Sequence, residues 1–380
     1  MTVRTTRIEN YSQNDRTLFV AFELGAKKWV LAFSTGVGQK PRKREMAAGD
    51  LDELQSEIAV AKKRFGLVPD AEVKSCYEAG RDGFWLDRYL LQAGIDNLVV
   101  DSSSIQVDRK KRHAKTDRLD VGKLLNQLIR YHSGDKSVWS IVRPPSPEEE
   151  DRRQVHRELQ ALRKERTRTT NRIKGLLATQ GVRLQGRMDL SQERLEAIRL
   201  WDDSPLLPGL KARLSREWDH RQFVNRQIAL LERQRNVTLR QSTEADVLKV
   251  KQKMTLRGIG IESAWLLSRE FGWRKFENRH QVGSLAGLTG TPFDSGESRR
   301  EQGISKSGNR RVRAVAIELA WSWIRHQPRS TITLWFEQRF ANAGKRARKI
   351  GIVAVARRLL IALWKFEQCG ELPEGALLKA

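Results

Sequence analysis

Short apolar runs and helical stripes alternate along the first third of the chain. Runs of apolar and β-branched residues bounded by polar or glycine-containing segments predict strands over residues 18–24, 29–33, 73–77 and 98–100. Apolar residues at helical spacing predict helices over residues 50–65, 84–93 and 117–131. This order of strands and helices predicts an α/β domain with a mixed sheet.

A proline-rich break over residues 143–147 (RPPSP) ends this region. Ser146, Pro147 and the glutamates that follow predict a helix start, because they supply a cap, a fixed φ and acids at the positive end of the dipole. Apolar residues then recur on 4-and-3 spacing over residues 155–176 and 214–231, with a turn at 201–209. The middle of the chain is therefore predicted to be a coiled-coil arm, whose role as spacer, dimerisation arm or nucleic-acid grip stays open.

From Met254 onward, short helical stretches are joined by glycine-rich turns, and a last helix is predicted over residues 345–366. This pattern predicts a third, largely helical domain. The predicted domains span residues 1–143, 144–250 and 251–380. The expected fold class is thus α/β plus all-α.

The charge of the chain points to a polyanionic partner. The 380 residues include 71 Lys and Arg against 46 Asp and Glu, a formal net charge of +25, while 39% hydrophobic residues allow packed cores. Each phosphate that Lys or Arg neutralises releases counterions, so nucleic acid is the leading candidate. A solvated basic surface remains the alternative.

Two cysteines, Cys76 and Cys369, exclude a disulfide framework and a cysteine-rich zinc module, and they fit a reducing compartment. The first 17 residues lack the apolar core of a signal peptide, and arginines interrupt the most apolar stretch, residues 350–364. We therefore expect a protein that is soluble and cytoplasmic.

Acidic residues stand at the ends of predicted elements. Glu23 ends the first strand, Glu78 follows the third, and Asp117 and Asp120 begin a helix. The two aspartates are one turn apart, so their Cβ atoms are roughly 5 to 6 Å from each other, close enough to hold a divalent cation. Taken alone, they also fit a charge pair that complements the helix dipole. Four oxygen ligands favour Mg²⁺, or Mn²⁺, over zinc.

Two basic, glycine-containing segments are candidates for phosphate contact. Residues 257–260 (RGIG) resemble the turn of a helix-hairpin-helix element, and an ordinary helix connection is the alternative. Residues 303–313 (GISKSGNRRVR) place basic side chains around a helix start. The candidate nucleic-acid-binding residues are Lys115, Arg257, Gly258, Gly260, Arg299, Arg300, Lys306, Asn309, Arg310, Arg311 and Arg313.

Ser295 precedes a glycine in a basic loop and is a candidate nucleophile. A turn residue is the usual explanation for such a serine, and no neighbouring histidine completes a hydrolase triad. Activation would have to come from a metal, from arginines or from a base elsewhere in the chain.

Several segments together resemble the transposases of the insertion sequence 110 family, the RNA-guided bridge recombinases. The segments, in the order and spacing of that family, are FVAFELGAKKWVLAF, CYEAGRDGFWLDRYLLQAGI, KTDRLDVGKLLNQLIR, TLRGIGIESAWLLSREFG and FENRHQVGSLAGLTGTPFDSGESRREQGISKSGNRRVR.

The resemblance implies a RuvC-like domain of ribonuclease H fold, a coiled-coil arm and a C-terminal transposase domain. It assigns a metal-binding acidic quartet to Glu23, Glu78, Asp117 and Asp120 and the nucleophile to Ser295. It also implies Mg²⁺, target and donor DNA, a noncoding guide RNA, and a homo-oligomer that is a dimer or tetramer in a bacterial or archaeal cell.

Two positions depart from the family pattern. The first acid is usually Asp, whereas Glu23 adds a methylene group, and Asp294 stands where a serine often precedes the nucleophile. Two other functions stay open: a metal-dependent nuclease such as a junction resolvase, which uses water as nucleophile, and a non-catalytic nucleic-acid scaffold.

Overall fold

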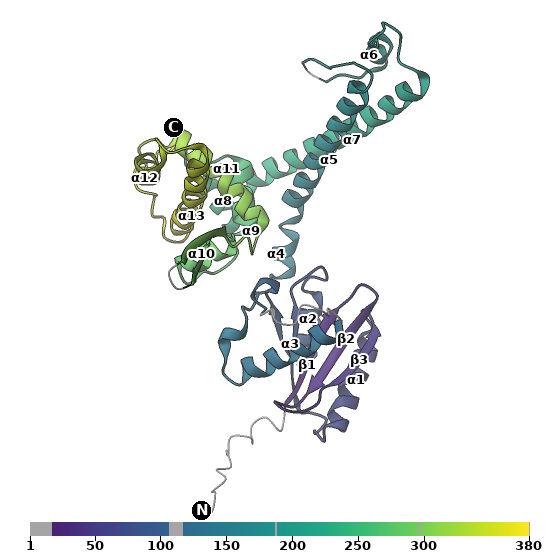
Figure 1. Ribbon diagram of the computed structural model, residues 1–380, viewed down its shortest axis with the longest axis vertical. Coiled ribbons are helices and arrows are strands. Elements are labelled where there is room, and N and C mark those ends of the chain that lie inside the picture. Colours follow the sequence, from purple (N-terminus) through teal and green to yellow (C-terminus); the bar gives the residue numbers. More distant parts are fainter. Residues whose placement is uncertain (1–16, 106–116, 187, 296–297, 380) are drawn as a thin grey trace, which may run out of the picture. The chain divides into compact units, whose positions relative to one another are not determined.

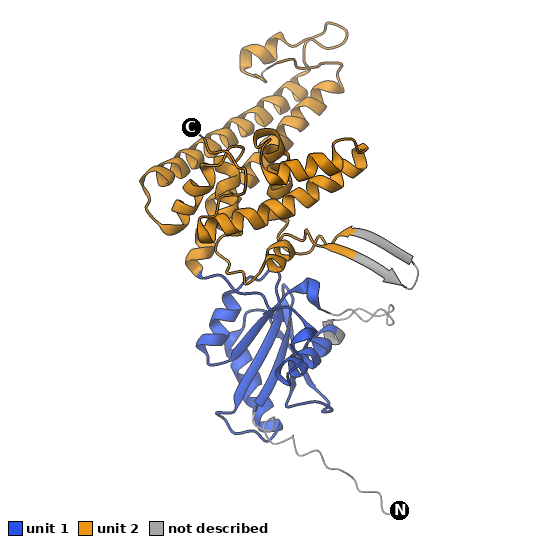
Figure 2. Cartoon of the chain, turned by 90° about the vertical axis from the view of Figure 1, so that its left-hand side faces the viewer, with its two compact units in different colours: residues 1–146 blue, residues 147–380 orange. Residues whose placement is uncertain are grey.

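The computed structural model describes residues 17–105, 117–186, 188–295 and 298–379. Only the backbone is described for residues 117–119, 292–295 and 298–302. The chain divides into two compact units, residues 1–146 and 147–380 (Figure 2).

A five-stranded mixed sheet forms the centre of the first unit (Figure 1). Its strands are β1 (Thr17–Leu24), β2 (Lys28–Ser34), β3 (Arg42–Ala47), β4 (Glu72–Glu78) and β5 (Asp96–Val100). They lie in the order β3-β2-β1-β4-β5, with β1, β4 and β5 parallel and β2 antiparallel to both its neighbours. The predicted mixed sheet is confirmed, but the sequence did not indicate β3.

Helices cover the two faces of this sheet. They are α1 (Leu51–Arg64), α2 (Trp85–Gln92) and α3 (Asp117–His132). Alternate residues of β1 divide between two cores: Phe22 packs with residues of α1 and α2, whereas Ala21 packs with residues of α3. This period of two is what a sheet buried on both faces requires.

The second unit begins with a helical arm. Its helices are α4 (Pro147–Asp151), α5 (Gln154–Ala178), α6 (Gln192–Ala197) and α7 (Pro208–Gln241). The long helices α5 and α7 pack together, as Figure 1 shows, through Leu159 with Val224 in one cluster and Ile173 with Leu214 in another. The helical hairpin predicted for the middle of the chain is therefore present.

The rest of the second unit is mostly helical. Its elements are α8 (Ala245–Met254), α9 (Ile261–Glu270), α10 (Arg279–Leu285), β6 (Gly290–Ser295), β7 (Ser298–Ile304), α11 (Arg310–His326), α12 (Thr331–Phe340) and α13 (Lys345–Cys369). One core, which includes Trp265, Trp323 and Leu359, joins α9, α11 and α13. The antiparallel pair β6–β7 is an addition that the sequence did not predict. In the part of the chain that is described, no helix combines the length and apolar character of a membrane span.

Candidate active site

Glutamates stand at the ends of two neighbouring parallel strands of the first unit, Glu23 as the second-last residue of β1 and Glu78 as the last residue of β4. Ala21 of β1 pairs with Cys76 of β4, and both side chains lie in the core beneath α3. Glu23 and Glu78 stand two residues further along, so the alternation of the strands directs both toward the face that α3 covers. Because adjacent strands are about 4.8 Å apart, the backbones of these two residues are near neighbours. Glu23 is half-buried and Glu78 is exposed.

Helix α3 crosses this face antiparallel to β1 and β4. The ring of His132, the last residue of α3, lies 5.9 Å from the ring of Phe19 near the start of β1. The Cys76 thiol, late in β4, lies 3.9 Å from the Leu124 carbonyl oxygen. The first turn of α3 therefore lies toward the ends of β1 and β4, where Glu23 and Glu78 stand.

Asp120 belongs to that first turn. Its side chain is 27% exposed, and its Oδ1 accepts a hydrogen bond of 3.2 Å from Nζ of Lys123. The backbone of Asp117 lies one helical turn earlier, but its side chain is outside the described residues. Among the side chains that are described, no three of His, Cys, Asp or Glu are grouped closely enough to hold a metal ion. The complete acidic quartet thus stays a prediction.

A lysine that the sequence analysis did not single out lies beside the same turn. Lys43 pairs with Ala32 across β2 and β3, and Ala32 belongs to the core beneath α3. Its Nζ lies 3.1 Å from the point where a Cβ on Gly122 would stand. Strand β3 therefore places the Lys43 ammonium group near the start of α3. The sequence analysis could have found this lysine only by predicting that residues 42–47 form a strand.

Ser295 is the last residue of β6 and pairs with Ser298 of β7. The expectation that Ser295 lies in a basic loop is therefore wrong, because this residue ends a strand of an antiparallel hairpin. Arg299 and Arg300 lie on β7, opposite Asp294 and Phe293. The side chains of these residues are outside the described part of the chain, as is the whole of Lys115.

Two glycines fix the base of the β6–β7 hairpin. A Cβ on Gly308 would stand 2.2 Å from the carbonyl oxygen of Leu285, and one on Gly287 would stand 1.9 Å from that of Ser307. Both glycines have positive φ, +81° and +61°. The N–H of Asn309 donates to the Leu285 carbonyl over 2.6 Å. The chain before α11 is thus packed directly on the end of α10, and larger residues have no space there.

A buried carboxylate joins this region to the arm. Glu270 is 2% exposed. It accepts two hydrogen bonds from the Arg157 guanidinium, at 2.7 and 2.9 Å, and one from the side-chain amide of Asn309, at 3.2 Å. Its Oε1 also lies 3.0 Å from Nε2 of His156. Burial raises the pKa of Glu270, but the hydrogen bonds from His156 and Arg157 outweigh it and hold the pKa well below its usual value. No spacing in the sequence indicated this cluster, because its members come from three separate helices.

The predicted phosphate-binding turn at residues 257–260 joins α8 to α9, which fits both a helix-hairpin-helix element and an ordinary helix connection. Arg257 is exposed, Gly258 has a φ of +83°, and Gly260 caps α9. The Gly258 carbonyl accepts from the Ser322 hydroxyl at 2.8 Å. Phosphate binding by this turn stays a prediction.

The basic segment before and within α11 divides into two groups. Asn309 caps α11 through Oδ1, and the Arg313 guanidinium donates to the carbonyls of Ala286 and Ser307 at 3.0 and 3.2 Å. These contacts give Asn309 and Arg313 structural roles that the sequence did not reveal. By contrast, Lys306, Arg310 and Arg311 are exposed, so their side chains are accessible to phosphate.

Comparisons with known proteins identify relatives of this chain. Residues 251–333 match the family described as "Transposase IS116/IS110/IS902 family". Protein y4rJ of Sinorhizobium fredii, whose name assigns it to the transposases, is 40% identical over 379 residues, covering 95% of this chain and 94% of that protein. The "Transposase for insertion sequence element IS1328" of Yersinia enterocolitica is 26% identical over 181 residues, covering 47% of this chain and 52% of that protein.

Proposed function

This chain belongs to the IS116/IS110/IS902 family of transposases, and on that premise we propose that it cuts and rejoins DNA through a covalent bond between Ser295 and a DNA phosphate. The first unit acts as a RuvC-like domain of ribonuclease H fold. The second unit contributes the serine.

The direction of α3 is the observation that supports this proposal most strongly. Because α3 runs antiparallel to β1 and β4, Asp120 in its first turn is carried toward Glu23 and Glu78 at the strand ends. Carboxylates gathered in a protein of net charge +25 would repel a phosphate backbone unless cations intervened. Glu23, Glu78, Asp117 and Asp120 would hold Mg²⁺ or Mn²⁺ through oxygen atoms alone, which suits these ions. A bound ion would polarise the scissile phosphate and neutralise charge on the leaving oxygen.

In the proposed reaction, Oγ of Ser295 attacks the phosphorus atom of a phosphodiester. A bond from serine oxygen to phosphorus forms, the bond from phosphorus to the leaving strand breaks, and the serine proton passes to a base while the leaving oxygen gains a proton. A hydroxyl of a second strand then attacks the phosphoserine and releases Ser295. One phosphate ester replaces another at each step, so no external energy source is needed.

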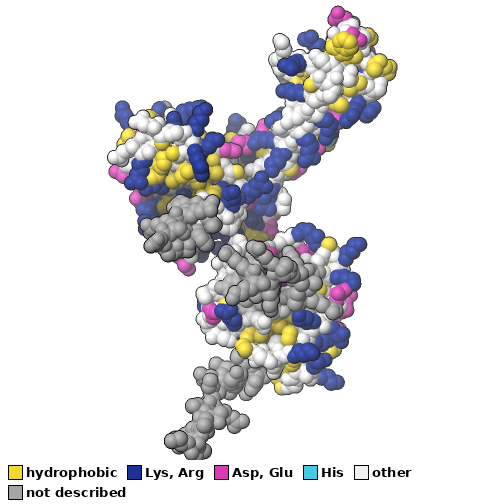
Figure 3. All heavy atoms as spheres, viewed as in Figure 1, with side chains coloured by type: hydrophobic (Ala, Val, Ile, Leu, Met, Phe, Trp, Pro, Cys, Tyr) yellow, Lys and Arg dark blue, Asp and Glu magenta, His cyan; other side chains and the backbone are white. Residues whose placement is uncertain are grey.

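We further propose that a noncoding RNA selects the DNA by base pairing and that the serine of one protomer works with the acids of another. Lysines and arginines are spread over the face of the molecule drawn in Figure 3, which supports an extended nucleic-acid partner. Purification of the protein with its own insertion sequence tests the first part: specific RNA that matches the DNA flanking the coding region should copurify. Recovery of only random cellular RNA would contradict guidance by RNA.

The variant Ser295→Ala tests the chemistry. It should lose both strand cleavage and the covalent protein–DNA adduct that denaturing gels detect. Ser298→Ala is the matched control, because Ser298 faces Ser295 across the hairpin, and it should retain both.

A metal-dependent nuclease that uses water is the second candidate, favoured by the fact that the acids and Ser295 belong to different units of the chain. Such an enzyme would keep cutting DNA in the Ser295→Ala variant and would form no adduct in the parent. A non-catalytic scaffold would tolerate Glu78→Ala and Asp120→Ala without any loss of recombination.

A further inference from the structure

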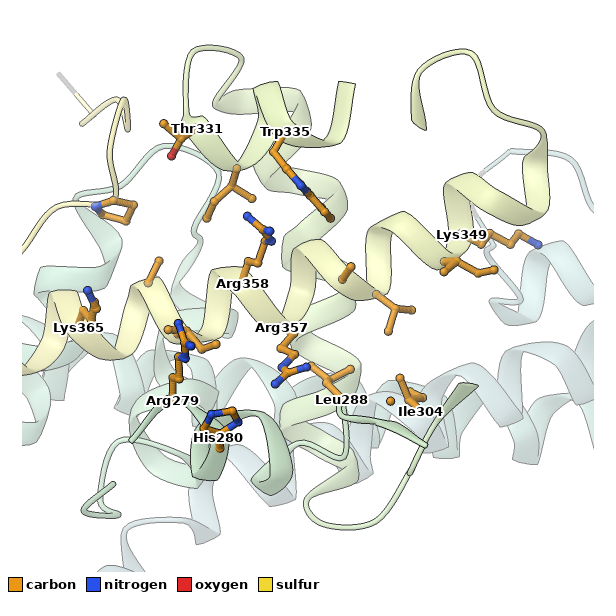
Figure 4. Close-up of a pocket in the computed structure, with 18 of the residues that line it drawn as sticks. Arg279, His280, Leu288, Ile304, Thr331, Trp335, Lys349, Arg357, Arg358 and Lys365 are labelled. Atoms are coloured by element: carbon orange, nitrogen blue, oxygen red, sulfur yellow. The ribbon is translucent and has the colours of Figure 1, made fainter. Parts of the chain in front are cut away.

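A groove of about 1390 Å³ runs along α13 in the second unit (Figure 4). One side of α13 lines this groove from Arg346 through Val353 and Ile361 to Lys365, while the other side packs in the core. Arg346 and Lys365 are nineteen positions apart on the helix, or about 29 Å at a rise of 1.5 Å per residue. We call this feature the α13 groove.

The rim of the α13 groove is strongly basic. Eight Lys and Arg residues line the groove as a whole, Arg357 and Arg358 from the middle of α13 (Figure 4), against the two acids Glu371 and Glu374. Arg279, Lys345, Arg346 and Lys349 are all exposed. Of the eight cations that line the groove, only Lys365 forms an ion pair within the described part of the chain, with Glu371 at 3.7 Å. Most of this positive charge is therefore available to a ligand.

The floor of the α13 groove is apolar. Leu288, Ile332 and Val353 line it, and Ile350 is 60% exposed there. The guanidinium of Arg358 lies 4.0 Å from the centre of the Trp335 ring, so a flat cationic surface stands on one wall, as Figure 4 shows. Figure 3 shows the same combination of hydrophobic side chains beside Lys and Arg over α12 and α13.

One end of the α13 groove meets the base of the β6–β7 hairpin. Gly290 and Ile304 line the groove and pair with each other at the start of β6 and the end of β7. Ser295 lies five residues further along β6, about 17 Å away at the rise of an antiparallel strand. A polymer bound in the groove is thereby directed to the hairpin that carries Ser295.

We propose that the α13 groove binds a single-stranded segment of the DNA on which Ser295 acts. Cations along the rim would pair with the phosphates of the strand. Unpaired bases would pack on the apolar floor and stack on the planar guanidinium of Arg358. A duplex hides its bases and would leave that floor in contact with water. A second copy of this chain would bring a further charge of +25 to a basic rim. The choice of DNA over RNA rests on the proposed function, because the strand that Ser295 attacks is DNA.

Fluorescence anisotropy with labelled oligodeoxythymidine of about 12 nucleotides tests this proposal on the full chain. The double variant Arg346→Gln/Lys349→Gln removes two exposed cations and should reduce the slope of log affinity against log salt by about 1.4. Ile350→Ser removes an exposed apolar contact and should weaken single-strand binding about fivefold while leaving duplex binding unchanged. Arg348→Gln is the matched control, since Arg348 is exposed on α13 but does not line the groove.

Three results would overturn the proposal. The first is binding of the oligonucleotide by the groove variants at the parental affinity. The second is an equal loss of duplex binding in these variants. The third is tighter binding of oligouridine with the same sensitivity to the variants. The adduct assay separates this proposal from the proposed chemistry. If Ser295 forms the adduct and the groove variants bind normally, only the groove proposal fails. If no adduct forms and the groove variants bind weakly, a single-strand site remains without the serine mechanism.

Discussion

The side-chain amide of Asn309 donates a hydrogen bond of 3.2 Å to Oε2 of Glu270. Oδ1 of Asn309 also accepts from the backbone N–H groups of Arg311 and Val312. One side chain therefore joins the start of α11 to the end of α9. Because Glu270 also bonds Arg157 of α5, the arm and the base of the β6–β7 hairpin are connected through a single buried carboxylate.

Replacement of Glu270 by Gln should destabilise the fold. The neutral amide leaves the Arg157 charge and the buried His156 without their anionic partner, and we expect a loss of roughly 3 kcal/mol in the free energy of unfolding. Urea denaturation measures this loss. Glu232→Gln removes a more exposed partner of Arg163 and should cost less than about 1 kcal/mol. Equal losses in the two variants would contradict a special role for Glu270.

The contribution of Glu270 should also depend on pH. Its folded pKa is lowered, so its stabilisation is complete above the unfolded value of about 4.3 and is lost as the pH falls below that value toward the folded pKa. The difference in unfolding free energy between the parent and Glu270→Gln should therefore shrink from about pH 5 to about pH 3. Denaturation curves at several pH values test this, and a constant difference would refute it.

Alanine at Gly308 should strain the base of the hairpin. The new Cβ would stand 2.2 Å from the Leu285 carbonyl oxygen, on a backbone with φ of +81°. We expect a loss of roughly 2 kcal/mol, visible as a lower melting temperature. Gly209→Ala, in the first turn of α7 with no atom within 4 Å of the new Cβ, should be neutral or stabilising by up to about 1 kcal/mol. Unchanged melting of Gly308→Ala would show that the chain can shift there.

Removal of the Glu78 charge should abolish activity without unfolding the protein. Glu78→Gln should lower strand cleavage by at least about 100-fold, because a carboxylate at the strand end is proposed to hold the metal. Its melting temperature should change little, since Glu78 is exposed. Glu72→Gln changes an exposed acid at the opposite end of β4 and should retain cleavage. Cleavage by Glu78→Gln at the parental rate would remove Glu78 from the site.

The sequence alone predicted the elements whose hydrophobic pattern is strong. The apolar runs of β1 and β2 and the helical stripe of α3 were each visible, and α13 begins at the predicted Lys345. Each of these elements buries side chains at regular intervals, so the spacing of its apolar residues is visible in the local sequence.

Elements with weak patterns were missed. In β3, three charged residues, Lys43 to Glu45, separate the buried Arg42 and Met46, so no apolar alternation is visible. This edge strand is instead held in place by its pairing with β2. The β6–β7 hairpin contains glycine, proline and several charged residues, so no strand pattern is visible. The chain on either side of the hairpin packs between the end of α10 and the start of α11, for example where Gly308 meets the Leu285 carbonyl. In both cases the determining interactions come from other parts of the chain.

By itself the sequence determined the charge, the types of candidate ligands and the positions of Glu23, Glu78 and Asp120 at the ends of elements. Tertiary structure decided that α3 runs back toward the ends of β1 and β4, that Glu270 joins three helices, and that the α13 groove has an apolar floor and a basic rim. The physical reason is that side-chain periodicity reports which face of one element is buried. The direction and neighbours of that element depend on packing between residues far apart in the chain.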